Sequence, residues 1–249
     1  SYKFTEIAGI YPITPASPMA EKVDVLASKG EINFWGNKVK VIEMESEKGA
    51  IATVHGALQA GVLATTYTAS QGLLLMIPSI YKMAGEMLPG VIHVAARSLS
   101  THSLSIFGDH QDIYAVRQTG ACMLSSSSVE EAYHMAMVSH LASIKSSLPF
   151  INFFDGFRTS HEIDKVKEID LSKLETLIDK KALRKFRDNG MISGATTRGT
   201  AENEDVYFQH TESRNGYYSK AIDNVIYYMD KINKICKTDY KPFNYYGDK

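Results

Sequence analysis

The chain has 249 residues, 44% of them hydrophobic and 22% charged, a near-average composition that argues against extensive disorder and suffices to bury a real core. Lysine and arginine number 27 against 28 aspartate and glutamate, so no overall positive field attracts nucleic acid or an anionic membrane. The longest apolar run, residues 72–77, is too short to span a membrane. We therefore expect a globular chain with neither a nucleic-acid nor a membrane partner.

The N-terminus and the cysteines narrow the class of protein further. The chain opens at Ser1 without Met or a signal pattern, and residues 1–9 have the pattern of a helix already under way. We expect a piece of a longer protein. Cys122 and Cys236 form no CxxC or zinc-type spacing and are too few for an iron–sulfur cluster. Two lone thiols suit a reducing compartment, which we take to be the cytoplasm.

Helical and strand patterns alternate through the first 165 residues. Short apolar or β-branched runs predict strands at residues 39–44, 65–69, 91–96, 121–124 and 150–154. Helical spacing predicts helices at residues 17–27, 46–63, 71–83 (broken near Pro78) and 129–145. Strands separated by helices indicate an α/β fold, with a mostly parallel sheet covered by helices on both faces.

The composition changes near Ile163. Residues 163–188 are highly charged with apolar residues at helical spacing, residues 189–216 resemble an extended loop, and residues 221–235 predict an amphipathic helix before a linker-like tail. We assign residues 1–165 to an α/β domain and residues 166–249 to an extension of it.

Polar residues directly after strands are the candidates for chemistry, because ligands of parallel sheets bind at the carboxyl ends of the strands. Thr14 lies in the proline-rich segment YPITPASP. The segment is either a rigid turn with Ser17 as a helix cap or a support that holds Thr14 toward a ligand. Arg97 ends the predicted strand at residues 91–96, where it suits either a salt bridge or an anionic ligand, above all a carboxylate.

Glu43, Glu45 and Glu47 alternate at the end of a strand and the start of the helix at residues 46–63. Acids at a helix N-terminus suit the helix dipole, so capping is one interpretation. The other is acid–base chemistry by Glu47, because this helix carries a face of Gly and Ala that predicts a crowded, desolvated surrounding.

Two further clusters have simpler interpretations. Asp109, His110 and Asp112 could suggest a metal site, but such groups are more often loop or capping residues. Asp155-Gly156 predicts a turn. The sequence contains no GxSxG, GxxxxGK[ST], GxGxxG or HExxH motif.

Five long blocks in order resemble the N-terminal, thiamine pyrimidine-binding domain of the pyruvate:ferredoxin (flavodoxin) oxidoreductase family. They are YPITPASPMAE, EMESEKGAIATVHGALQAG, TYTASQGLLLMIPSIYKMAGE, HVAARSLSTHSLSIFGDHQD and PFINFFDGFRTSHE, followed by a similar tail, FQHTESRNGYYSKAIDNVIYYMDKINKI. The resemblance implies an enzyme that uses thiamine diphosphate to convert pyruvate and coenzyme A to acetyl-CoA and CO2, with electrons passing through [4Fe-4S] clusters to ferredoxin or flavodoxin.

The resemblance also implies roles for single residues. Glu47 would hydrogen-bond N1′ of the cofactor's aminopyrimidine, and Thr14 and Arg97 would contact pyruvate, Arg97 at its carboxylate. The family's Mg²⁺-binding GDG…N motif and its cluster cysteines have no counterpart here. We therefore expect a catalytically incompetent fragment that binds no metal itself and works with the remaining domains of the same polypeptide, as a homodimer.

Two alternatives stay open at this point. The chain could serve an oxidoreductase for another 2-oxo acid, or it could be a non-catalytic dimerisation or assembly module. The face of small residues and the extended loop at residues 189–216 both suit contacts with a partner.

Overall fold

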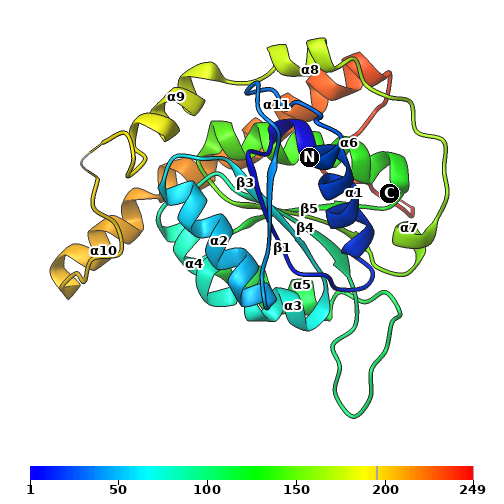
Figure 1. Ribbon diagram of the computed structural model, residues 1–249, viewed down its shortest axis with the longest axis horizontal. Helices are drawn as coiled ribbons and strands as arrows, with labels where there is room; N and C mark the ends of the chain where they lie inside the picture. The colour runs from blue at the N-terminus through cyan, green and yellow to red at the C-terminus, as the bar shows by residue number, and fades with distance from the viewer. Residues whose placement is uncertain (195, 249) are drawn as a thin grey trace.

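A computed structural model describes residues 1–194 and 196–248. One sheet of six parallel strands, in the order β2-β1-β3-β4-β6-β5, forms its centre (Figure 1). The strands are β1 (Ile7–Ile10), β2 (Lys40–Glu43), β3 (Ala64–Thr68), β4 (Val91–Ala96), β5 (Cys122–Ser126) and β6 (Phe150–Asp155). The predicted parallel α/β sheet is confirmed.

Helices connect and cover the strands. They are α1 (Ser17–Ser28), α2 (Glu47–Gln59), α3 (Ser70–Leu75), α4 (Ile77–Gly85), α5 (Gln111–Val116), α6 (Val129–Ser146), α7 (Arg158–His161), α8 (Leu171–Thr176), α9 (Lys180–Asp188), α10 (Glu204–Ser213) and α11 (Asn215–Cys236), with short 3-10 turns at Tyr2–Phe4 and Arg117–Thr119. None of the helices in these described ranges is both long and apolar enough to cross a bilayer.

The two faces of the sheet carry different helices (Figure 1). On one face His93 of β4 turns toward α6, where its Nε2 lies 3.4 Å from Nε2 of His140. On the other face Gly9 of β1 lies against α2, and a β-carbon at Gly9 would stand 2.6 Å from the Ala50 carbonyl oxygen. Glycine therefore permits a close approach that fixes the start of α2 over β1.

Local signals explain several helix ends. The Ser128 hydroxyl accepts a hydrogen bond from the Glu131 amide and caps α6, a position that favours serine. The predicted helix at residues 71–83 is broken at Met76, which ends α3 and precedes α4. Pro78 explains the break, because proline lacks the amide hydrogen that a continuous helix needs.

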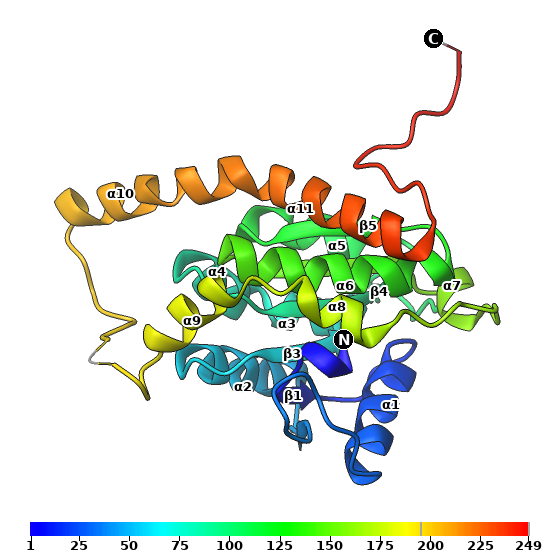
Figure 2. The same ribbon diagram turned by 90° about the horizontal axis from the view of Figure 1, so that it is seen from above.

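Helices α9 and α11 of the C-terminal third pack against α6. Figure 2 shows α11 running along α6, with α10 continuing the line of α11 past the sheet. Leu183 and Phe186 of α9 and Val225 and Tyr228 of α11 are buried in the same core as the sheet. This packing places the charged residues 163–188 against the α/β domain. The domain boundary at residue 165 stays a prediction.

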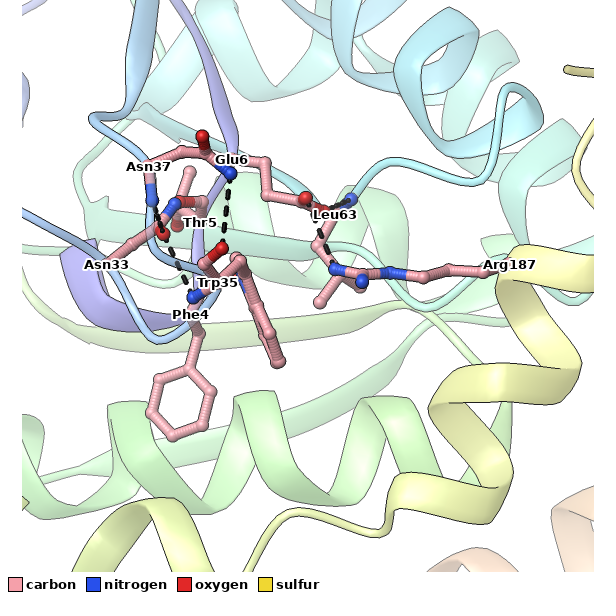
Figure 3. A network of polar contacts seen from close by, with 8 residues as sticks. All are labelled: Phe4, Thr5, Glu6, Asn33, Trp35, Asn37, Leu63 and Arg187. Carbon is pink, nitrogen blue, oxygen red and sulfur yellow. Dashed lines mark hydrogen bonds and ion pairs between the residues drawn. The ribbon is translucent and has the colours of Figure 1, made fainter. Parts of the chain in front are cut away.

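A polar network joins α9 to the amino ends of the inner strands β1 and β3 (Figure 3). The Glu6 carboxylate accepts hydrogen bonds from the Leu63 amide at 2.9 Å and from Arg187 Nη2 at 3.2 Å. The Arg187 guanidinium stacks over the Trp35 ring, 5.0 Å from its centre, and Trp35 Nε1 donates to the Phe4 carbonyl oxygen at 3.1 Å. The ion pair and the cation–π contact together hold α9 in place.

Three predictions about local structure are wrong. Residues 1–9 form a 3-10 turn and then β1 rather than a helix, because parallel pairing with β2 and β3 decides the conformation of a weakly patterned segment. The predicted loop at residues 189–216 contains helix α10, although residue 195 lies outside the described residues. Ser17 is the first residue of α1, not its cap, which is Ala16.

The predicted crowded face of α2 is correct only in part. Close contact exists near Ala50, but Ala52 and Gly56 are exposed, and nothing lies within 4 Å of the position where a β-carbon of Gly56 would stand. The crowding therefore occurs in the first turns of the helix and again at its C-terminal end, where a β-carbon at Gly190 would stand 2.6 Å from the Ala60 carbonyl oxygen.

Candidate functional site

The order in which strands are added to the sheet changes direction between β1 and β3. The chain leaves β1 through α1 to reach the edge strand β2, and it leaves β3 through α3 and α4 in the opposite direction, toward β4. In parallel sheets the carboxyl ends of such strands form the usual binding crevice. Thr14 follows β1, Glu47 follows β2 and Arg97 follows β4, so the three predicted site residues all lie at this edge of the sheet.

Glu47 is the first residue of α2, and its side chain is turned inward. Its exposed fraction is 7%, whereas Glu43 and Glu45 are exposed. The cap of α2 is Ser46, whose hydroxyl accepts a hydrogen bond from the Gly49 amide at 3.3 Å. Because Ser46 provides the cap, capping does not explain the burial of Glu47.

A glycine from the next helix lies directly against Glu47. A β-carbon at Gly72 of α3 would stand 2.8 Å from both Cγ and Oε1 of Glu47, and 2.6 Å from the Thr68 hydroxyl oxygen. No donor within residues 1–194 and 196–248 hydrogen-bonds to the Glu47 carboxylate, and the Thr68 hydroxyl is also buried without a partner. The carboxylate thus lies in a tight cradle with its hydrogen-bonding capacity available.

Arg97 and Thr14 come together across the edge of the sheet. Arg97 is 6% exposed, and its Nη1 donates a hydrogen bond to the Thr14 carbonyl oxygen at 2.6 Å. No ion pair to Arg97 forms among the described residues, so the salt-bridge interpretation finds no support there. Its Nε is buried without a hydrogen-bond partner. Such an unpaired donor is costly unless a ligand satisfies it.

Thr14 itself lies in a tight turn. The Thr14–Pro15 peptide bond is cis, and the Thr14 side chain is exposed. The prolines on either side restrict the backbone of the turn, and Thr14 is open to contact from outside this chain.

Asp112 also lies at this edge of the sheet. The sequence singled it out only as part of a possible metal site with Asp109 and His110. The Asp112 side chain is fully buried, and Oδ2 accepts hydrogen bonds from the Ser70 amide at 2.8 Å and the Arg97 amide at 3.1 Å. Burial raises the pKa of Asp112, and these amide donors oppose that rise. Burial likewise lowers the pKa of the Arg97 guanidinium, which the charge of Asp112 opposes.

The neighbouring polar residues have structural partners. Asp109 accepts a hydrogen bond from the Gln111 amide at 2.8 Å, and His110 packs edge-on against the Phe153 ring. Within the part of the chain that the structure describes, no cluster of three or more His, Cys, Asp or Glu side chains could hold a metal ion. Asp155 accepts from the Phe157 and Arg158 amides, which agrees with the predicted turn.

A hollow of about 550 Å³ lies elsewhere, between α1 and α6. Its lining includes His93, Asn152 and Tyr67 on the sheet but neither Glu47 nor Arg97. Cavity volume therefore does not point to the candidate residues. The candidate residues are found instead from their positions at the strand ends and, for Arg97, from its buried Nε without a hydrogen-bond partner.

Comparisons with known proteins show the family to which the chain belongs. The family described as pyruvate flavodoxin/ferredoxin oxidoreductase, thiamine diphosphate-binding, matches residues 1–230. The chain belongs to this family. As the sequence blocks implied, it corresponds to the N-terminal, thiamine diphosphate-binding part of these oxidoreductases.

Individual relatives of the family are much longer. The chain is 55% identical to the pyruvate-flavodoxin oxidoreductase of Enterobacter agglomerans and 52% identical to the pyruvate:ferredoxin oxidoreductase of Moorella thermoacetica. In both cases 99% of this chain aligns with only 21% of the relative. A solved 2-oxoglutarate:ferredoxin oxidoreductase from Magnetococcus marinus is 18% identical with a TM-score of 0.64, covering 89% of this chain and 42% of that chain. At this level of identity, the similarity shows a shared fold.

Proposed function

We propose that this family member supplies the pyrimidine-binding half of a thiamine diphosphate site in a larger enzyme that oxidatively decarboxylates pyruvate. In that reaction pyruvate and coenzyme A give acetyl-CoA and CO2, and two electrons pass to ferredoxin or flavodoxin. The chain spans about a fifth of the length of the two relatives named above. The coenzyme A site, the Mg²⁺ site and the [4Fe-4S] clusters then belong to remaining domains of the same polypeptide.

The environment of Arg97 is the strongest support for the proposal. The Arg97 guanidinium is almost fully buried at the crevice, is braced by the Thr14 carbonyl, and keeps Nε without a partner. A planar cation with a free donor is suited to the carboxylate of a 2-oxo acid. We assign Arg97 to that carboxylate, and Thr14, whose turn touches Arg97, to the same substrate.

The residues at the start of α2 fit the cofactor's pyrimidine. Glu47 offers a largely buried carboxylate that no described residue hydrogen-bonds, and Gly72 lets α3 pack directly against it, where a β-carbon would clash. When bound, thiamine diphosphate supplies a carbon nucleophile and an electron sink for the decarboxylation. Glu47 would orient the ring and hold a proton at its N1′ atom, which is the contribution that this chain's own acid makes to activation.

The proposal also covers the location, oligomeric state and domain boundaries of the enzyme. We place the enzyme in the cytoplasm as a homodimer, with residues 1–165 as the α/β domain and residues 166–249 as its extension. Since half of the thiamine site would lie outside this chain, the chain alone should bind the cofactor weakly. Tight binding of thiamine diphosphate and Mg²⁺ by this chain, measured by calorimetry, would contradict that division.

The experiment for the substrate assignment is Arg97→Ala in the full-length enzyme. Loss of a charge-assisted contact to the substrate should raise the KM for pyruvate by about tenfold or more. An unchanged KM would remove Arg97 from the substrate site. A panel of 2-oxo acids on the wild-type enzyme decides between pyruvate and another substrate of the same class.

A further inference from the structure

A single carboxylate joins the ends of the two central strands β3 and β4. The strands pair in register up to Thr68 and Val94. Beyond that pair, Asp112 Oδ2 accepts one hydrogen bond from the Ser70 amide and another from the Arg97 amide. Asp112 Oδ1 accepts a third from the Ile113 amide at 2.8 Å. The carboxylate therefore substitutes for the strand pairing that stops there.

The first of the two joined segments carries the contact with Glu47. Ser70 has a φ of +50°, in the left-handed region that non-glycine residues rarely adopt. Its hydroxyl lies 2.7 Å from the Ser98 carbonyl oxygen, a second tie to the segment after β4. Two residues later, Gly72 lies against the Glu47 carboxylate. The position of Gly72 on Glu47 thus depends on how the Ser70 turn is held.

The second joined segment carries the contact with Thr14. The Arg97 backbone is held by Asp112 on one side and by a bridge to Gly108 on the other. From this fixed backbone the guanidinium reaches the Thr14 carbonyl oxygen. A shift of the Arg97 amide would move the guanidinium away from that position.

A carboxylate is chemically suited to this place in a way that an amide is not. Three N–H donors converge on the two oxygens of Asp112. An ionised carboxylate only accepts, so it satisfies all three, whereas an asparagine must turn an NH2 group toward one of those donors. Leaving a buried amide N–H unpaired carries the full cost of its desolvation.

We propose that Asp112 is a positioning residue for both halves of the site: it holds the ends of β3 and β4 so that Gly72 packs on Glu47 and Arg97 reaches the substrate. This inference rests on the proposed function. Asp112 touches neither substrate nor cofactor in this role, and acts through the Ser70 and Arg97 amides.

The test is a double-mutant cycle in the full-length enzyme. Asp112→Asn should raise the KM for pyruvate about tenfold and weaken the apparent affinity for thiamine diphosphate. In an Arg97→Ala background the same substitution should change KM less than about twofold, because the group that it misplaces is already absent. An unchanged KM in Asp112→Asn, or an equal increase in both backgrounds, would overturn the inference.

Two further variants complete the experiment. Asp179→Asn is the matched control, because Asp179 caps α9 by accepting from the Lys181 and Ala182 amides far from the site; it should leave both KM and cofactor affinity unchanged. If Asp112→Asn does not fold, Ser70→Ala goes through the same cycle, since it removes the hydroxyl contacts with the Ser98 carbonyl and the Gln71 side chain but keeps the hydrogen bond from the Ser70 amide to Asp112. Ser70→Ala should raise KM severalfold in the wild-type background alone, and no change would contradict the inference. If the proposed function itself is wrong, Arg97→Ala will have the same KM for pyruvate as the wild type, which distinguishes that outcome from failure of the Asp112 inference.

Discussion

Gly72 packs so closely on Glu47 that a β-carbon would stand 2.8 Å from the carboxylate oxygen Oε1. The two residues come from helices that follow different strands, β3 and β2, and they meet at the carboxyl edge of the sheet. The absence of a side chain at position 72 is therefore part of what defines the space around the acid.

The first prediction concerns this contact. In the full-length enzyme, Gly72→Ala should lower kcat roughly 10- to 100-fold, because the new methyl group displaces Glu47 from its productive position. Gly56→Ala is the matched control, since Gly56 lies within α2 and its β-carbon would meet nothing within 4 Å. That control should leave kcat unchanged and increase helix stability by up to about 1 kcal/mol. Equal kcat values for the two variants would contradict the account of Gly72.

A second prediction concerns the acid stability of this chain. Burial disfavours the ionised form of Glu86, but hydrogen bonds from His55, Lys82 and Gln59 outweigh it and lower the pKa of the carboxyl from 4.5 to about 2. A depressed carboxyl pKa stabilises the folded state above pH 4.5, and this contribution is lost as the pH falls toward 2. Glu86→Gln should therefore lower stability at neutral pH, with a difference that disappears toward pH 2.

Urea unfolding of the wild type and of Glu86→Gln across this range measures the difference. After allowance for solvent screening we expect about 1–2 kcal/mol at neutral pH. Exposed Glu212 provides the control substitution, Glu212→Gln, which should show no comparable dependence. A difference between wild type and Glu86→Gln that stays constant down to pH 2 would exclude Glu86 as the source.

A third prediction concerns the attachment of α9 to the sheet. Arg187→Ala removes the ion pair with Glu6 and the cation–π contact with Trp35, and it should destabilise the folded chain by about 1–2 kcal/mol. Arg184 lies on the same helix but is exposed, so Arg184→Ala should change stability by less than about 0.5 kcal/mol. Chemical denaturation compares the two variants, and matching losses would show that the network in Figure 3 contributes little.

Local patterns were enough to predict most of the sheet. The strand predicted at residues 91–96 matches β4 at both ends, because all six residues are buried and form one continuous run of mainly apolar side chains. Thr14, Glu47 and Arg97 could be selected as candidates because each follows a strand or opens a helix, and parallel strands place such positions at one edge. Their substrate and cofactor roles came from the family resemblance rather than from spacing.

The predictions that failed depended on contacts remote in sequence or on weak local signals. Strand β1 consists of Ile, Ala and Gly, and its conformation is set by pairing with β2 and β3. Helix α10 has no buried residue, so it lacks the apolar stripe that predicts a helix, although Glu204 and Asp205 suit its first turn. The role of Asp112 depends on the amides of Ser70 and Arg97, which only the folded chain brings together.

The most direct test of the account is the exchange of the thiazolium C2 hydrogen of bound thiamine diphosphate with solvent deuterium, measured in the full-length enzyme and in its Glu47→Gln variant. If Glu47 holds the proton at N1′ of the pyrimidine, the substitution should slow this exchange by about 100-fold or more while the enzyme stays folded and still binds the cofactor. Exchange at the wild-type rate in folded, cofactor-loaded Glu47→Gln would contradict the assignment of Glu47 and, with it, the central claim about this site.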